Sequence, residues 1–515
     1  MRLSRLIEKI DAGNIKKVSA GNKNPADPWV TGIHYRSDQV GPGGIFVAIS
    51  GQKTDGHDFA QDAAARGAAV VVSQKPLDID VRVIEVKNTR KALAEMAAVF
   101  HGNPSEKMAL IGVTGTNGKT TTAFLLEHIL QCEGLRSGMI GTINYHYSGT
   151  IVKSGLTTPE APDLQSVLAE MAEAGVNHVI LEVSSHGVAL ERIRGCRFAA
   201  GIFTNLSQDH LDFHGDMEQY WAAKKRFFTD YIKETGARAI LNMDDKKGRE
   251  LAAELEGITQ VRVGLSDTAQ IRASELRFDQ KGISGLLHLG KESFEFHCPL
   301  AGRFNLENIL CAAGAAFCLG VSRKAVQEGI GTFVSVPGRL ERVPNLLSRH
   351  VFVDFSHTPA ALENVLTTLR EVADGRVICI FGCGGDRDRG KRPAMGDIVA
   401  RYSDLAVVTS DNPRTEPPEK IIEDIVKGIV GHRNIEPESL TPDFEPGLFT
   451  VEADRRKAIR LGIRASKPGD TVLIAGKGHE TYQIIGEKTV AFDDRLEAAQ
   501  VLSRGINDVA NTMDD

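Results

Sequence analysis

The chain has 515 residues, of which 42% are hydrophobic and 25% are charged, a composition typical of a folded globular protein rather than a disordered one. This length exceeds what one hydrophobic core can organise, so we expect about three domains. The 61 basic and 67 acidic residues give a net charge of −6, which disfavours a nucleic acid as partner.

The cysteines and the apolar runs indicate the compartment. Seven scattered cysteines without a C-x-x-C pair favour a reducing environment and disfavour a zinc site. The first residues, MRLSRLIEKIDAGN, carry charges throughout, so we expect a short amphipathic helix rather than a signal peptide. No apolar run approaches the roughly 20 residues that a membrane span needs. We therefore expect a cytoplasmic monomer that acts on small molecules and binds neither membrane nor nucleic acid.

Two turn-rich segments divide the chain. Apolar runs at 44–50, 68–73 and 81–86 predict strands, and a helix is expected over 89–100. The polar stretch HGNPSEK that follows predicts a first boundary, and a second falls near Val-Pro-Gly at 336–338, after a predicted helix at 305–319. The expected domains are residues 1–103, 104–337 and 338–515.

From residue 108 onward, short apolar strands alternate with longer helical segments, which predicts α/β domains with parallel sheets. Ligands of such sheets bind beyond the carboxyl ends of the strands, and here nearly every predicted strand is followed by Gly, His, Asp, Asn, Lys or Arg. This arrangement is typical of an enzyme. The predicted strands are 110–113, 179–183, 201–204, 351–354, 377–381, 406–409 and 472–475.

The segment TGTNGKTT at 114–121 lies between a predicted strand and a predicted helix. Its glycines would let backbone N–H groups converge on phosphate oxygens, while Lys119 reaches the β- and γ-phosphates and Thr120 binds Mg²⁺. The strict G-x-x-x-x-G-K-[ST] pattern would require glycine where the chain has Val113. The alternative is a glycine turn that merely opens a helix, but the order of strand, G-K-T and helix favours a nucleotide site.

Three other polar residues are less specific on their own. Glu182 ends a strand, and its carboxylate with the imidazole of His210 would suit the Mg²⁺ of bound ATP. His210 alone fits a hydrogen-bonded loop histidine better than a metal ligand. Lys224, in YWAAKKR, has the pattern of a solvated helix face.

The motifs TGTNGKTTT, LEVSSH, TNLSQDHLDFHG, YWAAK, GRFNLENILCA, GRLERV, VDFSHTP and DNPR occur in the order found in the Mur ligases of peptidoglycan synthesis, and the chain resembles this family over most of its length. The resemblance implies a UDP-binding amino-terminal domain, a central P-loop ATPase domain and a carboxyl-terminal Rossmann-like domain. It also implies the chemistry: ATP phosphorylates the D-glutamate γ-carboxylate of the UDP-linked substrate, and the amine of an incoming amino acid displaces phosphate.

The resemblance further implies roles for single residues. Leu190 stands where several members carry a glutamine that touches the muramoyl substrate, so we expect no such contact here. The implied Mg²⁺ ligands are Thr120, Glu182, His210 and a carbamylated Lys224 (N6-carboxylysine), and Lys119, Glu182, His210 and Lys224 form the implied catalytic set. The implied ATP contacts are Gly115, Thr116, Asn117, Gly118, Lys119, Thr120, Thr121, Asn305, Arg339 and Asp354. The implied UDP-sugar contacts are Ser37, Thr157, Thr158, Ser184 and Arg192.

The tetrapeptide Asp411-Asn412-Pro413-Arg414 bears on which amino acid is added. Meso-2,6-diaminopimelate carries one carboxylate more than lysine, and an arginine can bind that carboxylate with two hydrogen bonds. Lysine would leave such an arginine unpaired, at a cost in binding. Because family members that add diaminopimelate carry arginine at this position, the resemblance implies a ligase joining meso-diaminopimelate to UDP-N-acetylmuramoyl-L-alanyl-D-glutamate. The other implied amino-acid contacts are Arg387, Gly476 and Glu480.

Three alternatives remain at this stage. A lysine-adding sister ligase would differ at Arg414. A folylpolyglutamate synthetase would share the ATPase core but lack the amino-terminal domain with Ser37 and the DNPR motif. An ATP-binding module without activity would release no phosphate with the correct substrates, and the joint presence of Lys119, Glu182, His210 and Lys224 argues against it.

Overall fold

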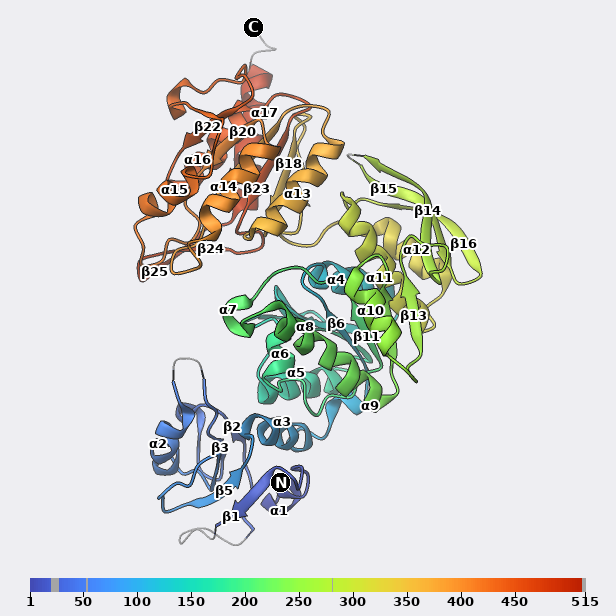
Figure 1. Ribbon diagram of the computed structural model, residues 1–515, viewed down its shortest axis with the longest axis vertical. Helices are drawn as coiled ribbons and strands as arrows, with labels where there is room; N and C mark the ends of the chain where they lie inside the picture. Colours follow the sequence, from blue (N-terminus) through green and yellow to red (C-terminus); the bar gives the residue numbers. More distant parts are fainter. Residues whose placement is uncertain (20–26, 52–53, 280, 512–515) are drawn as a thin grey trace. The chain divides into compact units, whose positions relative to one another are not determined.

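The computed structural model describes residues 1–19, 27–51, 54–279 and 281–511 (Figure 1). By its internal contacts the chain divides into two compact units, residues 1–272 with 310–329, and residues 273–309 with 330–515. In the described part of the chain, no helix combines the length and the apolar character needed to cross a membrane.

The amino-terminal part is a five-stranded sheet in the order β1-β5-β4-β3-β2. Strands β2 to β5 run parallel and β1 pairs antiparallel with β5. The elements are α1 (Leu3–Ile7), β1 (Ile15–Val18), β2 (Ile33–His34), η1 (Ser37–Gln39), β3 (Ile45–Val47), η2 (Gly56–Phe59), α2 (Ala60–Ala65), β4 (Val70–Ser73), β5 (Arg82–Val86) and α3 (Thr89–Phe100). The three predicted strands and the predicted helix are thereby confirmed, although β3 is shorter than its apolar run.

The next part of the chain forms a larger sheet around the P-loop strand. Strands β13, β12, β11, β6, β10 and β7 lie side by side and parallel, and β8 and β9 extend the sheet antiparallel. The strands are β6 (Ala109–Thr114), β7 (Ser137–Ile140), β8 (Asn144–Tyr147), β9 (Thr150–Lys153), β10 (His178–Glu182), β11 (Ala200–Phe203), β12 (Arg238–Asn242) and β13 (Gln260–Val263). Strand β14 (Ile271–Asp279) leads into an antiparallel pair, β15 (Gly282–Leu289) and β16 (Glu292–Cys298).

Helices connect these strands, and one of them changes its hydrogen-bonding pattern. Helix α8 continues into a π-helical turn, η4, directly after its last residues, and such turns are frequent at functional sites. The helices are η3 (Pro104–Glu106), α4 (Lys119–Cys132), α5 (Ala161–Glu173), α6 (Ser185–Ala189), α7 (Leu211–His214), α8 (Met217–Arg226), η4 (Phe227–Ile232), α9 (Lys233–Thr235), α10 (Lys246–Glu254), α11 (Arg303–Cys318) and α12 (Arg323–Thr332).

The carboxyl-terminal part holds a seven-stranded sheet in the order β17-β18-β23-β19-β20-β22-β21. Its strands are β17 (Glu341–Arg342), β18 (His350–Asp354), β19 (Val377–Phe381), β20 (Leu405–Val408), β21 (Arg433–Asn434), β22 (Leu448–Val451) and β23 (Thr471–Ala475). A separate hairpin follows, β24 (Tyr482–Ile485) with β25 (Lys488–Ala491). The helices are α13 (Pro359–Val372), α14 (Lys391–Tyr402), α15 (Pro418–Val426), η5 (Pro437–Ser439), α16 (Arg455–Ala465) and α17 (Asp494–Asn511).

Alternate residues of the seven-stranded sheet pack into two separate cores. Phe381 and Leu473 pack with α13, α14 and α15, whereas Ile380 and Ile474 pack with α16 and α17 (Figure 1). Because successive strand residues point to opposite faces, these apolar runs require helices on both faces. The predicted α/β fold with parallel strands is confirmed. The strands of each sheet lie within one of the expected domains, while the boundaries at 103 and 337 stay predictions.

Candidate functional site

The phosphate-loop candidate joins the end of β6 to the start of α4, as the sequence predicts. Gly118, at the start of α4, has φ +81, a left-handed conformation that glycine adopts without strain. A Cβ at Gly115 would lie 1.9 Å from the Thr204 hydroxyl oxygen. Only a residue without a side chain therefore lets this loop pack against the segment after β11.

That segment also fixes the loop by hydrogen bonds. The Asn117 backbone N–H donates to Asn205 Oδ1 at 2.9 Å, and the Thr204 hydroxyl donates to the Asn117 carbonyl at 2.6 Å. The Thr116 hydroxyl donates to the Ser207 carbonyl at 3.1 Å. The loop shape is thus set by residues about 90 positions away in the chain, which local sequence patterns could not show.

Two lysine amines meet at one carbonyl of the loop. Lys119 Nζ donates to the Gly115 carbonyl at 3.0 Å, and Lys224 Nζ donates to the same oxygen at 2.7 Å. Lys224 is 1% exposed, so the solvated helix face indicated by its local pattern was wrong. Burial, reinforced by the charge of Lys119, holds the pKa of Lys224 well below its ordinary value. A lowered pKa favours the neutral amine, which is the form that reacts with carbon dioxide.

Glu182, at the end of β10, is a fully buried carboxylate surrounded by hydroxyl groups. The Thr120 hydroxyl donates to Glu182 Oε2 at 3.0 Å, and Thr142 donates its hydroxyl to Oε2 at 3.0 Å and its backbone N–H to Oε1 at 2.9 Å. Within the described residues the side-chain partners of this carboxylate are Thr120 and Thr142, and no basic side chain pairs with it. A buried anion without a cationic partner, beside a P-loop threonine, fits a divalent cation.

His210 lies in a loop with φ +53, and its side chain is 44% exposed. Its ring is 4.9 Å from that of His186 and 6.0 Å from that of Tyr220. Burial and the neighbouring histidines lower the pKa of His186 to about 4, so this ring is neutral at pH 7. Over the described ranges, no three His, Cys, Asp or Glu side chains gather closely enough to hold a metal by themselves. A metal here would need hydroxyl or substrate oxygens as well.

Four of the five expected UDP-sugar contacts lie together. The Thr158 hydroxyl is 3.0 Å from the Ser184 hydroxyl, and Arg192 Nη1 donates to the Thr158 carbonyl at 3.1 Å. Thr157 is connected to this group through Thr142, because the hydroxyl oxygens of Thr142 and Thr157 lie 3.1 Å apart. The fifth, Ser37, hydrogen-bonds Asp62 in the amino-terminal part.

Charged contacts join the amino-terminal part to this cluster. Glu160 Oε1 lies 2.8 Å from Arg192 Nη2, and its Oε2 accepts from Arg90 of α3 at 3.2 Å. The Tyr35 hydroxyl, two residues before Ser37, donates to Asp163 of α5 at 2.8 Å. Glu160 and Arg90 were not expected from the sequence, because neither belongs to a motif.

Of the expected ATP contacts in the second unit, two lie close together. Asp354 is buried at the end of β18, and its Oδ2 accepts a hydrogen bond from the Leu340 N–H at 2.6 Å. Burial raises the pKa of Asp354, although the charge of Arg339 acts to lower it. The Arg339 guanidinium lies 4.8 Å from the centre of the Phe355 ring. Asn305, in the first turn of α11, instead donates to the carbonyl of Ala301, which precedes that helix, at 2.7 Å.

The expected amino-acid contacts converge on the loops after β19, β20 and β23. Arg414 has φ +52, and its Nη1 donates to the Gly385 carbonyl at 2.8 Å. A Cβ at Gly384 would lie 2.9 Å from Arg414 Nη1 and 3.7 Å from Arg387 Cγ, so both arginines approach this turn. Among the described side chains no carboxylate pairs with Arg414. Its guanidinium is therefore available to an anionic ligand.

Asn412 connects the loop after β20 to the loop after β23. Its Nδ2 donates to Glu480 Oε2 at 2.9 Å, and its Oδ1 accepts from Lys477 Nζ at 3.1 Å and from the Ile484 N–H at 3.0 Å. A Cβ at Gly476 would come within 2.6 Å of Asp411 Oδ2, which explains why the close approach of the two loops needs glycine.

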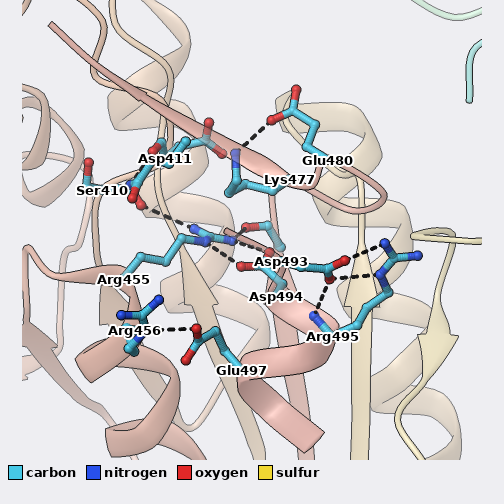
Figure 2. A network of polar contacts seen from close by, with 12 residues as sticks. Ser410, Asp411, Arg455, Arg456, Lys477, Glu480, Asp493, Asp494, Arg495 and Glu497 are labelled. Atoms are coloured by element: carbon cyan, nitrogen blue, oxygen red, sulfur yellow. Dashed lines mark hydrogen bonds and ion pairs between the residues drawn. The ribbon is translucent and has the colours of Figure 1, made fainter. Parts of the chain in front are cut away.

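Two buried cations near these loops were missed by the sequence analysis. Lys477 is 0% exposed, and its Nζ lies 2.7 Å from Glu480 Oε2. Figure 2 marks this contact. Arg455 pairs with Asp494 in the same view, with both side chains 0% exposed. Lys477 stands between the expected contacts Gly476 and Glu480 and could have been noticed there. Arg455 and Asp494 are 39 residues apart, and no local pattern links them.

Comparison with known proteins places three segments in one family. Residues 30–101 match the model described as Mur ligase family, catalytic domain, residues 113–316 match Mur ligase middle domain, and residues 338–478 match Mur ligase, glutamate ligase domain. The UDP-N-acetylmuramoyl-L-alanyl-D-glutamate--2,6-diaminopimelate ligase of Geobacter metallireducens is 45% identical over 91% of this chain and 93% of its own length.

Solved structures show the same relationship. One of a UDP-N-acetylmuramoyl-L-alanyl-D-glutamate--2,6-diaminopimelate ligase has a TM-score of 0.66 and 32% identity, covering 92% of this chain and 95% of that chain. A Mycobacterium tuberculosis folylpolyglutamate synthase complexed with ADP and AMPPCP has a TM-score of 0.59 and 19% identity, covering 74% and 91%. The second likeness is one of fold alone.

Proposed function

This chain belongs to the Mur ligase family, and we propose that it joins meso-2,6-diaminopimelate to UDP-N-acetylmuramoyl-L-alanyl-D-glutamate in peptidoglycan synthesis. The observation that carries the proposal is Arg414, a guanidinium without an acidic partner among the described residues. It lies in the same loop as Asp411, and Asn412 of that loop donates to the carboxylate of Glu480 in the loop after β23. A substrate with both amines and carboxylates complements such a mixture of charges.

The chain is an ATP-dependent ligase of the ADP-forming type. A carboxylate is a poor electrophile, so its oxygen first takes the γ-phosphoryl group of ATP, which releases ADP and leaves an acyl phosphate. The neutral amine of diaminopimelate then attacks the acyl carbon, and inorganic phosphate leaves as the amide forms. In this proposal Lys119 and the N–H groups of residues 115–121 bind the phosphates and stabilise charge on the transferred group.

Mg²⁺ and a carbamate belong to the proposal as groups that the residues fit. Thr120, Glu182 and His210 would hold Mg²⁺, and a carbamylated Lys224 would hold a second Mg²⁺. Bound there, the ions would neutralise the phosphate charges during transfer. Two observations support these assignments: the buried carboxylate of Glu182 has no basic partner among the described residues, and the pKa of Lys224 is lowered.

The UDP-linked substrate would contact Ser37, Thr157, Thr158, Ser184 and Arg192. In this proposal Glu160 orients Arg192, because its Oε1 accepts from Arg192 Nε at 3.0 Å. Asn305, Arg339 and Asp354 would contact ATP, and Arg387, the residues from Asp411 to Arg414, Gly476 and Glu480 would contact diaminopimelate. The proposal also includes a UDP-binding domain at 1–103, an ATPase domain at 104–337 and an amino-acid-binding domain at 338–515.

We further propose a monomer in the cytoplasm that has no nucleic-acid or membrane partner. The net charge of −6 and nucleotide-linked small-molecule substrates support this assignment. Light scattering of the purified protein after gel filtration tests the monomer, and a dimer mass would overturn it. Fractionation of cells tests the location.

The decisive experiment is a competition in one tube. The protein is incubated with ATP, Mg²⁺, UDP-N-acetylmuramoyl-L-Ala-D-Glu, meso-diaminopimelate and L-lysine, and products are identified by mass spectrometry. We expect the diaminopimelate adduct with one phosphate released per adduct. A lysine adduct alone would agree with ligase activity but overturn the proposed specificity for diaminopimelate. Absence of any adduct would overturn the proposed function. Lys119→Ala serves as the inactive control.

A further inference from the structure

A buried ion pair lies beneath the two loops that carry the proposed amino-acid contacts. Arg455 Nε donates to Asp494 Oδ1 at 2.8 Å, and its Nη2 donates to Asp494 Oδ2 at 2.8 Å, so the pair is bidentate. Both side chains are 0% exposed. Each is the first residue of a helix, Arg455 of α16 and Asp494 of α17 (Figure 2).

The remaining donors of Arg455 reach both loops at their first residues. Nη1 donates to the Ser410 carbonyl at 3.4 Å, and Nη2 donates to the Ala475 carbonyl at 2.9 Å. Ser410 directly precedes Asp411, and Ala475 directly precedes Gly476. The Ala475 carbonyl belongs to the last residue of β23, and Ser410 lies two residues after the end of β20; these two strands flank β19 in the sheet. One guanidinium therefore bridges the loops that follow two strands, β20 and β23, which are not adjacent in the sheet.

The stability of α16 does not explain this arginine. A basic residue in the first turn of a helix opposes the helix dipole, and a buried charge is costly even when paired. Burial would lower the pKa of Arg455, but the charge and hydrogen bonds of Asp494 raise it. The charges of Asp411 and Glu480 also raise the pKa of Arg455.

We propose that Arg455, held by Asp494, is a positioning residue for amino-acid recognition that fixes the distance between the 411–414 loop and the 476–480 loop. The inference rests on the proposed function, because it assumes that these loops bind diaminopimelate. Arg455 acts through the loop backbones and touches no substrate. Without Arg455 the two loops can move apart, so that Arg414 and Glu480 can no longer contact the two ends of one diaminopimelate molecule.

The test replaces both partners, Arg455→Met with Asp494→Leu, because removing one alone would leave a buried unpaired charge. We expect KM for diaminopimelate to rise about ten-fold or more, since small misplacements of binding groups are costly, while KM for ATP and the melting temperature stay near wild type. An unchanged diaminopimelate KM in the folded double variant would overturn the proposal.

The chain offers a matched control pair at the opposite, amino-terminal ends of the strands of the same sheet. Arg376 and Asp470 directly precede β19 and β23, and Arg376 Nη2 lies 2.6 Å from Asp470 Oδ2. Arg376→Met with Asp470→Leu should alter the melting temperature without altering KM for diaminopimelate. Equal KM increases in both double variants would show a general loss of rigidity and overturn the positioning role.

Hydrogen–deuterium exchange separates this inference from the proposed function, because it needs no substrate. Backbone amides in 411–416 and 476–484 should exchange faster in the Arg455→Met, Asp494→Leu variant and at the wild-type rate in the control variant. If the double variant does not fold, Asp494→Asn, which keeps one acceptor, is compared with Asp470→Asn by the same two measurements. Unchanged exchange in the loops overturns the inference, whereas a wild-type protein that ligates no diaminopimelate overturns the proposed function alone.

Discussion

Substituting Arg414 tests the specificity assignment most directly. Its Nη1 already donates to the Gly385 carbonyl at 2.8 Å, which leaves the other guanidinium donors for a ligand carboxylate. A charge-assisted hydrogen bond contributes about 1.5–3 kcal/mol, and the half-buried position favours the lower part of the range for each of two bonds. Arg414→Ala should therefore cost about 3 kcal/mol of transition-state binding, or roughly 100-fold in kcat/KM for diaminopimelate.

The assay measures kcat/KM for meso-diaminopimelate and for L-lysine as competing substrates. Arg414→Ala should reduce the first and leave the second unchanged, so that discrimination is lost. Arg414→Lys keeps the charge but loses the planar fork, and we expect about a ten-fold loss. Arg433→Ala, an exposed arginine of β21, is the matched control and should change neither value.

Backbone conformation supplies an independent check on folding. Because Arg414 has φ +52, where glycine is unstrained, Arg414→Gly should not lower the melting temperature although it removes the guanidinium. A loss of less than about three-fold in kcat/KM for the folded Ala and Gly variants would refute the specificity reasoning. An equal loss with L-lysine would refute it too.

Three further predictions concern the loop, the lysine and pH. Gly115→Ala should abolish turnover and lower the melting temperature, because its Cβ would lie 1.9 Å from Thr204 Oγ1; an active, stable variant would contradict this packing. Activity should fall when carbon dioxide and bicarbonate are removed and return on their addition, and Lys224→Met should show no such response; a wild-type rate independent of carbon dioxide would disprove the carbamate. The Arg392 hydrogen bond, as the largest cause, lowers the pKa of Glu416 from 4.5 to about 2, so this pair contributes stability above pH 4.5 that is lost as the pH falls towards 2. Urea unfolding should therefore show a weaker acid dependence between pH 4.5 and 2 for Glu416→Gln, and parallel curves would contradict the assignment.

Much of the fold follows from local patterns in the chain. The predicted runs 377–381 and 472–475, which form β19 and most of β23, are apolar at every position, as a strand buried on both faces requires, and helix α3 begins and ends where predicted. Strand order could not be derived this way, because β23 inserts between β18 and β19 from a distant part of the chain. Its position depends on long-range packing.

In the site, too, residues contiguous in sequence could be predicted, whereas contacts between residues remote in sequence could not. Gly115 to Thr120 could be recognised because a phosphate loop is contiguous in sequence. Lys224 could not be assigned from its surroundings, since its burial against Gly115 comes from a contact 109 residues away. Arg455 escaped notice for the same reason, because its partners Asp494, Ser410 and Ala475 are remote in sequence.

Pro413 directly follows Asn412, and this order affects how readily the asparagine side chain is lost by deamidation. An asparagine deamidates when the backbone nitrogen of the next residue attacks its side-chain amide. The aspartate formed from Asn412 would face the Glu480 carboxylate, whose Oε2 now accepts from the Asn412 amide at 2.9 Å. Proline has no backbone N–H with which to make that attack. The amide that connects the two loops is thus shielded from deamidation by its own neighbour, so a slowly renewed protein would keep this contact intact.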